Sequence, residues 1–96
     1  MQRARTFLVE RYLPELRAAD VEALGGRLAA ATAEMRREGR RVEWVRSLGI
    51  PGDEACVCSF RAASAADVDE ANARAGAAYE RIVEAMPVEN ARPAEL

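Results

Sequence analysis

The sequence predicts an α+β domain in which two helices cover one face of an antiparallel sheet. Segments in which apolar and polar side chains alternate, as is typical of strands, are separated by segments with apolar residues at helical spacing. A turn sequence, Pro51-Gly52-Asp53, joins two of the strand segments directly and so predicts a hairpin. A chain of 96 residues is enough for one such domain with a thin core.

Residues 55–62, which read ACVCSFRA, are predicted to form a central strand. Side chains two positions apart in a strand share a face, so Cys56, Cys58 and Phe60 should point one way. Val57, Ser59 and Arg61 should point the other way. Residues 6–13, which Pro14 ends, and residues 42–48 are expected to be two further strands.

The first helix is predicted to begin near Asp20, as its N-cap, and to end at Gly39. Its apolar face would carry Val21, Leu24, Leu28, Ala31 and Met35. Gly25 and Gly26 interrupt this helix, and a close approach to the sheet would explain them. Ser64, followed by Asp67, predicts the start of a second helix that Gly76 ends.

Residues 79–88 fit a helix or, more loosely, a strand by their periodicity, and the topology favours the strand. With that fourth strand the order becomes β-α-β-β-α-β, which is the ferredoxin-like arrangement. We expect one domain over residues 1–88. Residues 89–96 are polar and are predicted to be a disordered tail.

Both faces of the predicted sheet carry apolar residues, although the helices can cover only one. One face should hold Phe7, Val9, Trp44, Cys56, Cys58 and Phe60, and the other Leu8, Tyr12, Val45 and Val57. We therefore predict a homodimer, a dimeric α/β barrel, that packs sheet against sheet around a cavity.

Composition narrows the classes of function. The net charge is −2, with acids and arginines mixed along the chain, which argues against a general nucleic-acid or membrane-surface binder. The N-terminal apolar run is too short for a signal peptide, and no stretch approaches a membrane span. We expect a cytoplasmic protein whose two cysteines are reduced.

Three features are candidates for chemistry, and each has a structural alternative. Cys56 and Cys58 are either soft metal ligands or small core residues beside Phe60, and free cysteine favours the core. Glu10 is either a base or ligand in the cavity or the partner of an arginine such as Arg46 or Arg61. The aromatic residues Tyr12, Trp44 and Phe60 line a pocket or form core and interface.

The chain resembles a small bacterial family of ferredoxin-like dimers, some of them described as nickel-binding, over roughly residues 6–88. The shared motifs are Val9-Glu10-Arg11 with Leu13-Pro14, Trp44-Val45 with Ser47, Cys58 with Phe60 and Ala62, and the run EANARAG from Glu70 to Gly76. The resemblance implies that residues 79–88 form a strand. Metal-binding members carry histidine at two places where this chain has Arg46 and Asn72, and the chain contains no histidine. Because a guanidinium repels a metal cation, what remains of that pattern is Glu10, Cys58 and Cys56.

We therefore expect a homodimer that binds a metal ion, nickel by resemblance, or a small ligand between its sheets, without catalysis of its own. The predicted ligand-binding residues are Glu10, Tyr12, Trp44, Arg46, Phe60 and Asn72, and the predicted metal ligands are Glu10, Cys58 and Cys56. The alternative is a small cofactor-free enzyme of the monooxygenase or isomerase type that uses Glu10 with Arg46. Such sites often use histidine, and its absence counts against this alternative.

Overall fold

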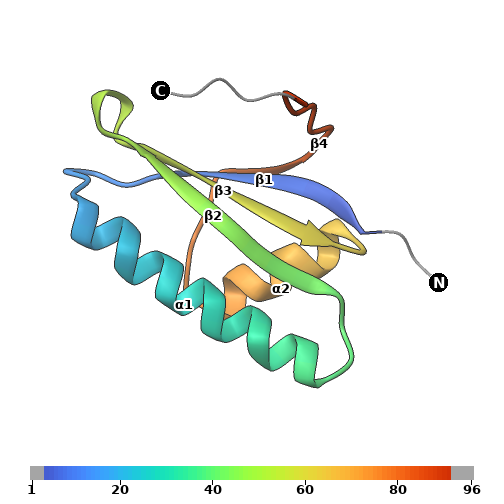
Figure 1. Cartoon of the computed structure of the whole chain (residues 1–96). Coiled ribbons are helices and arrows are strands. Elements are labelled where there is room, and N and C mark those ends of the chain that lie inside the picture. Colours follow the sequence, from blue (N-terminus) through green and yellow to red (C-terminus); the bar gives the residue numbers. More distant parts are fainter. Residues whose placement is uncertain (1–3, 92–96) are drawn as a thin grey trace.

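Four antiparallel strands form one sheet, and both helices lie on the same side of it (Figure 1). The structure is a computed structural model that describes residues 4–91. Its elements are β1 (Arg5–Tyr12), α1 (Ala18–Arg37), β2 (Val42–Ile50), a 3-10 turn (Pro51–Asp53), β3 (Ala55–Ala62), α2 (Ala65–Arg74) and β4 (Arg81–Ala85). The strand order in the sheet, β2-β3-β1-β4, places β1 and β3 in the centre. The predicted ferredoxin-like order and the β2–β3 hairpin are confirmed.

The core lies between the sheet and the helices, as the alternation of the strands predicted. Its buried residues on the strands are Phe7, Val9, Val42, Cys56, Cys58, Phe60 and Ala62. From α1 it receives Leu24, Leu28, Ala31 and Met35, four of the five residues predicted for that face. Val21 and Trp44 are half-buried and pack against this core.

The start of α1 differs from the prediction by one turn of helix. The helix begins at Ala18 with Arg17 as N-cap, and the Asp20 carboxylate lies inside the first turn, where it accepts a hydrogen bond from the Arg17 backbone N–H at 3.1 Å. Gly39 follows the end of the helix with a φ of 85°, as expected for a glycine stop. Within residues 4–91 no helix is long and apolar enough to cross a membrane.

The second half of the chain follows the predicted pattern closely. Ser64 caps α2 by accepting a hydrogen bond from the Asp67 backbone N–H at 3.3 Å. Beyond α2 the chain forms β4, which pairs with β1, so the ambiguous segment is a strand, shorter than predicted. Of the predicted tail, residues 89–91 are irregular, and residues 92–96 lie outside the described residues.

A bulge in β2 decides which way the second half of that strand faces. The register with β3 shifts between Trp44 and Arg46, so Val45 is an extra residue without a partner. Trp44 still pairs with Phe60 and faces the helices, whereas Arg46 pairs with Ser59 on the other side of the sheet. Without the bulge, simple alternation would place Arg46 on the same face as Trp44.

Candidate functional site

The side of the sheet away from the helices, here called the open face, has no covering element among the described residues (Figure 1). It carries Thr6, Leu8, Glu10, Tyr12, Arg46, Leu48, Ile50, Val57, Ser59, Arg61, Arg81 and Val83. Several apolar side chains on this face are exposed, among them Leu48 at 56% and Val45 at 43%. Both apolar faces predicted from the sequence are therefore present.

A hollow of about 1110 Å³ lies on the open face. It is lined by Ala4, Arg5, Thr6, Leu8, Val45, Arg46, Leu48, Val57, Ser59, Arg61, Glu84, Ala85, Met86, Pro87 and Glu89. The floor comes from β1, β2 and β3, and one wall comes from the end of β4 and the chain that follows it. We call this region the open-face hollow.

Arg46 and Arg61 are the two arginines of the hollow that no carboxylate of residues 4–91 contacts. Both are exposed, and neither forms a hydrogen bond or an ion pair with any residue of the described range. By contrast, Arg5 forms an ion pair with Glu84 at 3.2 Å, between Nη1 and Oε1. Two guanidinium groups beside an apolar floor therefore remain available to a ligand.

Glu10 and Tyr12 lie on the open face but outside the lining of the hollow. Glu10 forms an ion pair with Arg81, which stands opposite it on β4, so its partner is neither Arg46 nor Arg61. The hydrogen bond from Arg81 keeps the pKa of the Glu10 carboxyl below its usual value. The Tyr12 hydroxyl lies 3.4 Å from the Glu54 Oε1, at the far end of β1.

Cys56 and Cys58 face the helices, are free thiols and are fully buried. Their Sγ atoms are 3.9 Å apart, and the Cys58 Sγ lies 2.9 Å from the Ser47 Oγ. Burial, together with the neighbouring Cys58, raises the pKa of Cys56 to about 11. Because the thiolate is the form that binds a metal, a metal ion at Cys56 would have to displace this proton.

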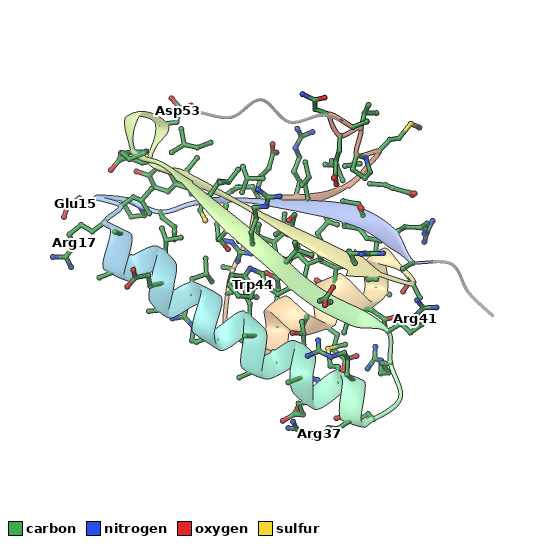
Figure 2. All side chains as sticks on the ribbon, viewed as in Figure 1. Glu15, Arg17, Arg37, Arg41, Trp44 and Asp53 are labelled. Carbon is green, nitrogen blue, oxygen red and sulfur yellow. The ribbon has the colours of Figure 1, made fainter. Side chains whose placement is uncertain are left out.

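Trp44, Phe60 and Asn72 also lie on the helix side of the sheet. Trp44 stands between β2 and α1 (Figure 2), and its Nε1 donates to the Ser47 Oγ at 3.0 Å. The Asn72 Oδ1 accepts a hydrogen bond of 2.6 Å from Nη2 of the buried Arg11. Phe60 and Asn72 are fully buried, so these two side chains do not reach the open face.

Nη1 of Arg11 donates to the backbone oxygens of Ala77 and Ala78, each at 3.2 Å. The Arg11 Nε has no hydrogen-bond partner among the described residues. The guanidinium is thus held by an amide and two carbonyl oxygens, and Asn72 serves to hold it. Sequence reasoning assigned Asn72 to the cavity and attached no role to Arg11.

The structure therefore brings only part of the predicted site together. Of the six predicted ligand-binding residues, Arg46 lines the hollow, Glu10 and Tyr12 share its face, and the other three are on the opposite side of the sheet. The predicted metal ligands are likewise divided, because Glu10 is on the open face and both cysteines are in the core. Within the described range, no group of three or more His, Cys, Asp or Glu side chains is placed to hold a metal ion. Within residues 4–91, the donors of one chain are therefore not arranged to hold a nickel ion.

Sequence reasoning did not assign Leu8, Leu48, Val57, Ser59 or Arg61 to the site. The signal for three of them was present, because alternation along 55–62 puts Val57, Ser59 and Arg61 on the face opposite the cysteines. The contribution of Met86 and Pro87 had no such signal, since it depends on where the chain runs after β4.

Comparisons with known proteins agree on the fold and the family. No curated protein matches the chain. The crystal structure of SCO4226 from Streptomyces coelicolor A3(2) is similar, with a TM-score of 0.74 at 16% sequence identity, over 88% of this chain and 99% of that one. The model of the family described as "Nickel responsive protein SCO4226-like" matches residues 7–85. Because that match spans most of the sequence, the chain belongs to the SCO4226-like family of nickel responsive proteins.

Proposed function

We propose that this protein is a non-catalytic homodimer that packs open face against open face and binds a small ligand in the open-face hollow. The observation that carries the proposal is the hollow itself, which has apolar residues in its floor and two arginines that no carboxylate of the described residues contacts. Leu48, Val45 and Ile50 are exposed on this face, and exposed apolar residues grouped among polar ones often mark an interaction surface. A second copy related by a two-fold axis would cover it with the same surface.

The environment of Glu10 supports binding rather than catalysis. A general base works best when its pKa is near the working pH, which for a carboxyl requires an upward shift. The ion pair with Arg81 shifts the pKa of Glu10 in the opposite direction. Glu10 would then contribute to the sheet and to the rim of the dimer interface as a carboxylate paired with Arg81.

The family description suggests nickel as a candidate ligand, but the residues of this chain do not favour a nickel site. A nickel site would need donors from both protomers, since one protomer places no suitable cluster within residues 4–91. Three arginines and two glutamates line the hollow, and Arg46 and Arg61, which no carboxylate of residues 4–91 contacts, would repel a divalent cation. We therefore propose a small organic ligand in place of the metal.

The test is native mass spectrometry of the untagged protein, combined with elemental analysis after incubation with nickel or zinc. Untagged protein is essential, because a polyhistidine tag would add the ligands that this chain lacks. We expect twice the 10.5 kDa of one chain and no stoichiometric metal after dialysis. A monomer at all concentrations would contradict the dimer.

Retained nickel, one ion per chain or per dimer, would contradict the organic ligand. Two variants would then locate the metal. Glu10→Gln removes a carboxylate donor on the open face, and Cys58→Ser removes a thiol in the core. Loss of nickel in one variant but not in the other would assign the site to that side of the sheet, provided that circular dichroism shows both variants to be folded.

A further inference from the structure

We propose that the ligand of the open-face hollow is an organic carboxylate with an apolar body, held by the guanidinium groups of Arg46 and Arg61. This inference rests on the proposed function, because it names the class of ligand that the same hollow takes. It adds to that function the negative charge of the ligand, the apolar character of its body, and the two arginines that would bind its carboxylate.

The register of the sheet places Arg46 and Arg61 near each other on the open face. Arg46 on β2 stands directly opposite Ser59 on β3, and Arg61 is two residues further along β3 on the same face. Side chains two residues apart on a strand are separated by roughly 7 Å, and directly opposed ones are closer. Two long guanidinium side chains rooted at these positions can reach the same carboxylate, with the Ser59 hydroxyl between them. Arginine suits this task because its planar fork donates two parallel hydrogen bonds.

Among residues 4–91, no carboxylate contacts these two cations. Arg5 is already paired with Glu84. Glu43 stands opposite Arg61 across the ladder, and Glu89 lines the hollow, but neither forms an ion pair with Arg46 or Arg61. Once a second sheet covers the hollow, an unpaired guanidinium loses water without a compensating charge, which is costly. An anion supplied by the ligand removes that cost.

The floor of the hollow explains why the anion should carry an apolar body. Leu48 and Val57 stand opposite each other on β2 and β3, Leu8 stands opposite Ser59 on β1 and so lies diagonal to Val57, and Met86 lines the wall. A small inorganic anion would leave these surfaces facing water, whereas an alkyl or aryl group would bury them. The combination of an apolar floor and a few polar groups at one end is typical of pockets for small amphipathic molecules.

The experiment is a titration of the untagged protein with hexanoate, followed by NMR chemical shifts and by native mass. The uncharged 1-hexanol has the same body without the charge, and inorganic phosphate has the charge without the body. The test variants are Arg46→Gln and Arg61→Gln, both at exposed positions that should not affect folding. The matched control is Arg37→Gln, which removes an exposed guanidinium in the last turn of α1, away from the open face (Figure 2).

We expect hexanoate to shift the resonances of open-face residues and to bind more tightly than either control compound. Each test variant should weaken hexanoate binding about tenfold or more, as expected for the loss of a charged hydrogen bond, and Arg37→Gln should not. Equal binding of hexanoate and 1-hexanol, tighter binding of phosphate, no binding of hexanoate, or no loss in the test variants would overturn the inference. The native mass reports separately on the dimer, so a dimer without carboxylate binding refutes this inference alone, and a monomer that binds hexanoate through both arginines refutes only the dimer.

Discussion

At the scale of single residues, the role of the two cysteines of β3 follows from their burial between the sheet and the helices. Both are fully buried, and their sulfur atoms are in contact with each other or with Ser47. Burial disfavours the thiolate of Cys56 and raises its pKa, because a charge is poorly solvated there. The same sequence feature that suggested a metal site, two cysteines on one strand face, therefore belongs to the core of the protein.

The raised pKa of Cys56 predicts a specific loss of stability at alkaline pH. In the unfolded chain this thiol titrates near its ordinary value of 9.0, and in the folded protein its pKa is about 11. Since the folded state holds the proton more tightly, the stabilisation is complete below pH 9 and is lost as the pH rises towards 11. We expect the free energy of unfolding to fall by about 2–3 kcal/mol over this range, measured by urea titration.

Cys56→Ala is the control for this pH dependence, because it removes the titrating group. Tyr79 contributes in the same direction, since its hydrogen bond to Asp69 raises the pKa of the phenol, so Tyr79→Phe is the second control. A pH dependence that is unchanged in Cys56→Ala would show that Cys56 does not carry it.

At the scale of elements, the distance between α1 and β2 is set by a glycine. A Cβ atom built on Gly25 would lie 2.9 Å from both Cη2 and Cζ2 of Trp44, whereas one built on Gly26 would meet nothing within 4 Å. The close approach that the glycine pair suggested from the sequence is therefore made by Gly25 alone. Gly26 is exposed and weakens the helix without a packing reason visible in the structure.

This asymmetry predicts different effects on stability for two alanine substitutions. Gly26→Ala should stabilise the protein by about 1 kcal/mol through helix propensity. Gly25→Ala gains the same amount but displaces the Trp44 ring, at a cost of about 1–3 kcal/mol, so it should be neutral or destabilising. Urea unfolding of both variants at one protein concentration measures the difference. Equal stabilisation by both would mean that Trp44 moves aside freely.

An element could be predicted from the sequence where the pattern that marks it lies within a short stretch of the chain. The helix stops at Gly39 and Gly76, the Ser64 cap and the alternation in β3 lie within short stretches, and the structure agrees with each. The bulge at Val45 depends on pairing with β3, which lies on the other side of a turn. The bulge determines the face on which Arg46 lies. Because no local pattern marks the bulge, the pairing of Arg46 with Ser59 could not be predicted from the sequence.

At the scale of the whole molecule, the sheet divides the predicted site into two halves with different roles. Residues on the helix side, such as Phe60 and Asn72, complete a core that one chain builds by itself. On the open face, exposed apolar side chains lie beside arginines that form no ion pair within residues 4–91. Apolar residues on both faces could be recognised from the sequence, and they motivated the prediction of a dimer. The wall made by residues 84–89 could not, because it depends on the path of the chain after β4.

The proposed dimer predicts that a charge in the middle of the open face separates the protomers and leaves each one folded. Leu48 is 56% exposed in a single protomer, so Leu48→Glu should change the stability of that protomer little. In the dimer the new carboxylate would be buried against the partner sheet without a fixed counter-charge, which costs several kcal/mol and should weaken association by about a hundredfold or more.

Ala29→Glu, on the exposed side of α1, is the matched control and should leave the dimer intact. Sedimentation velocity measures the association and circular dichroism the fold. A Leu48→Glu dimer as tight as the original would place the interface elsewhere, and dissociation by Ala29→Glu would place it on the helices.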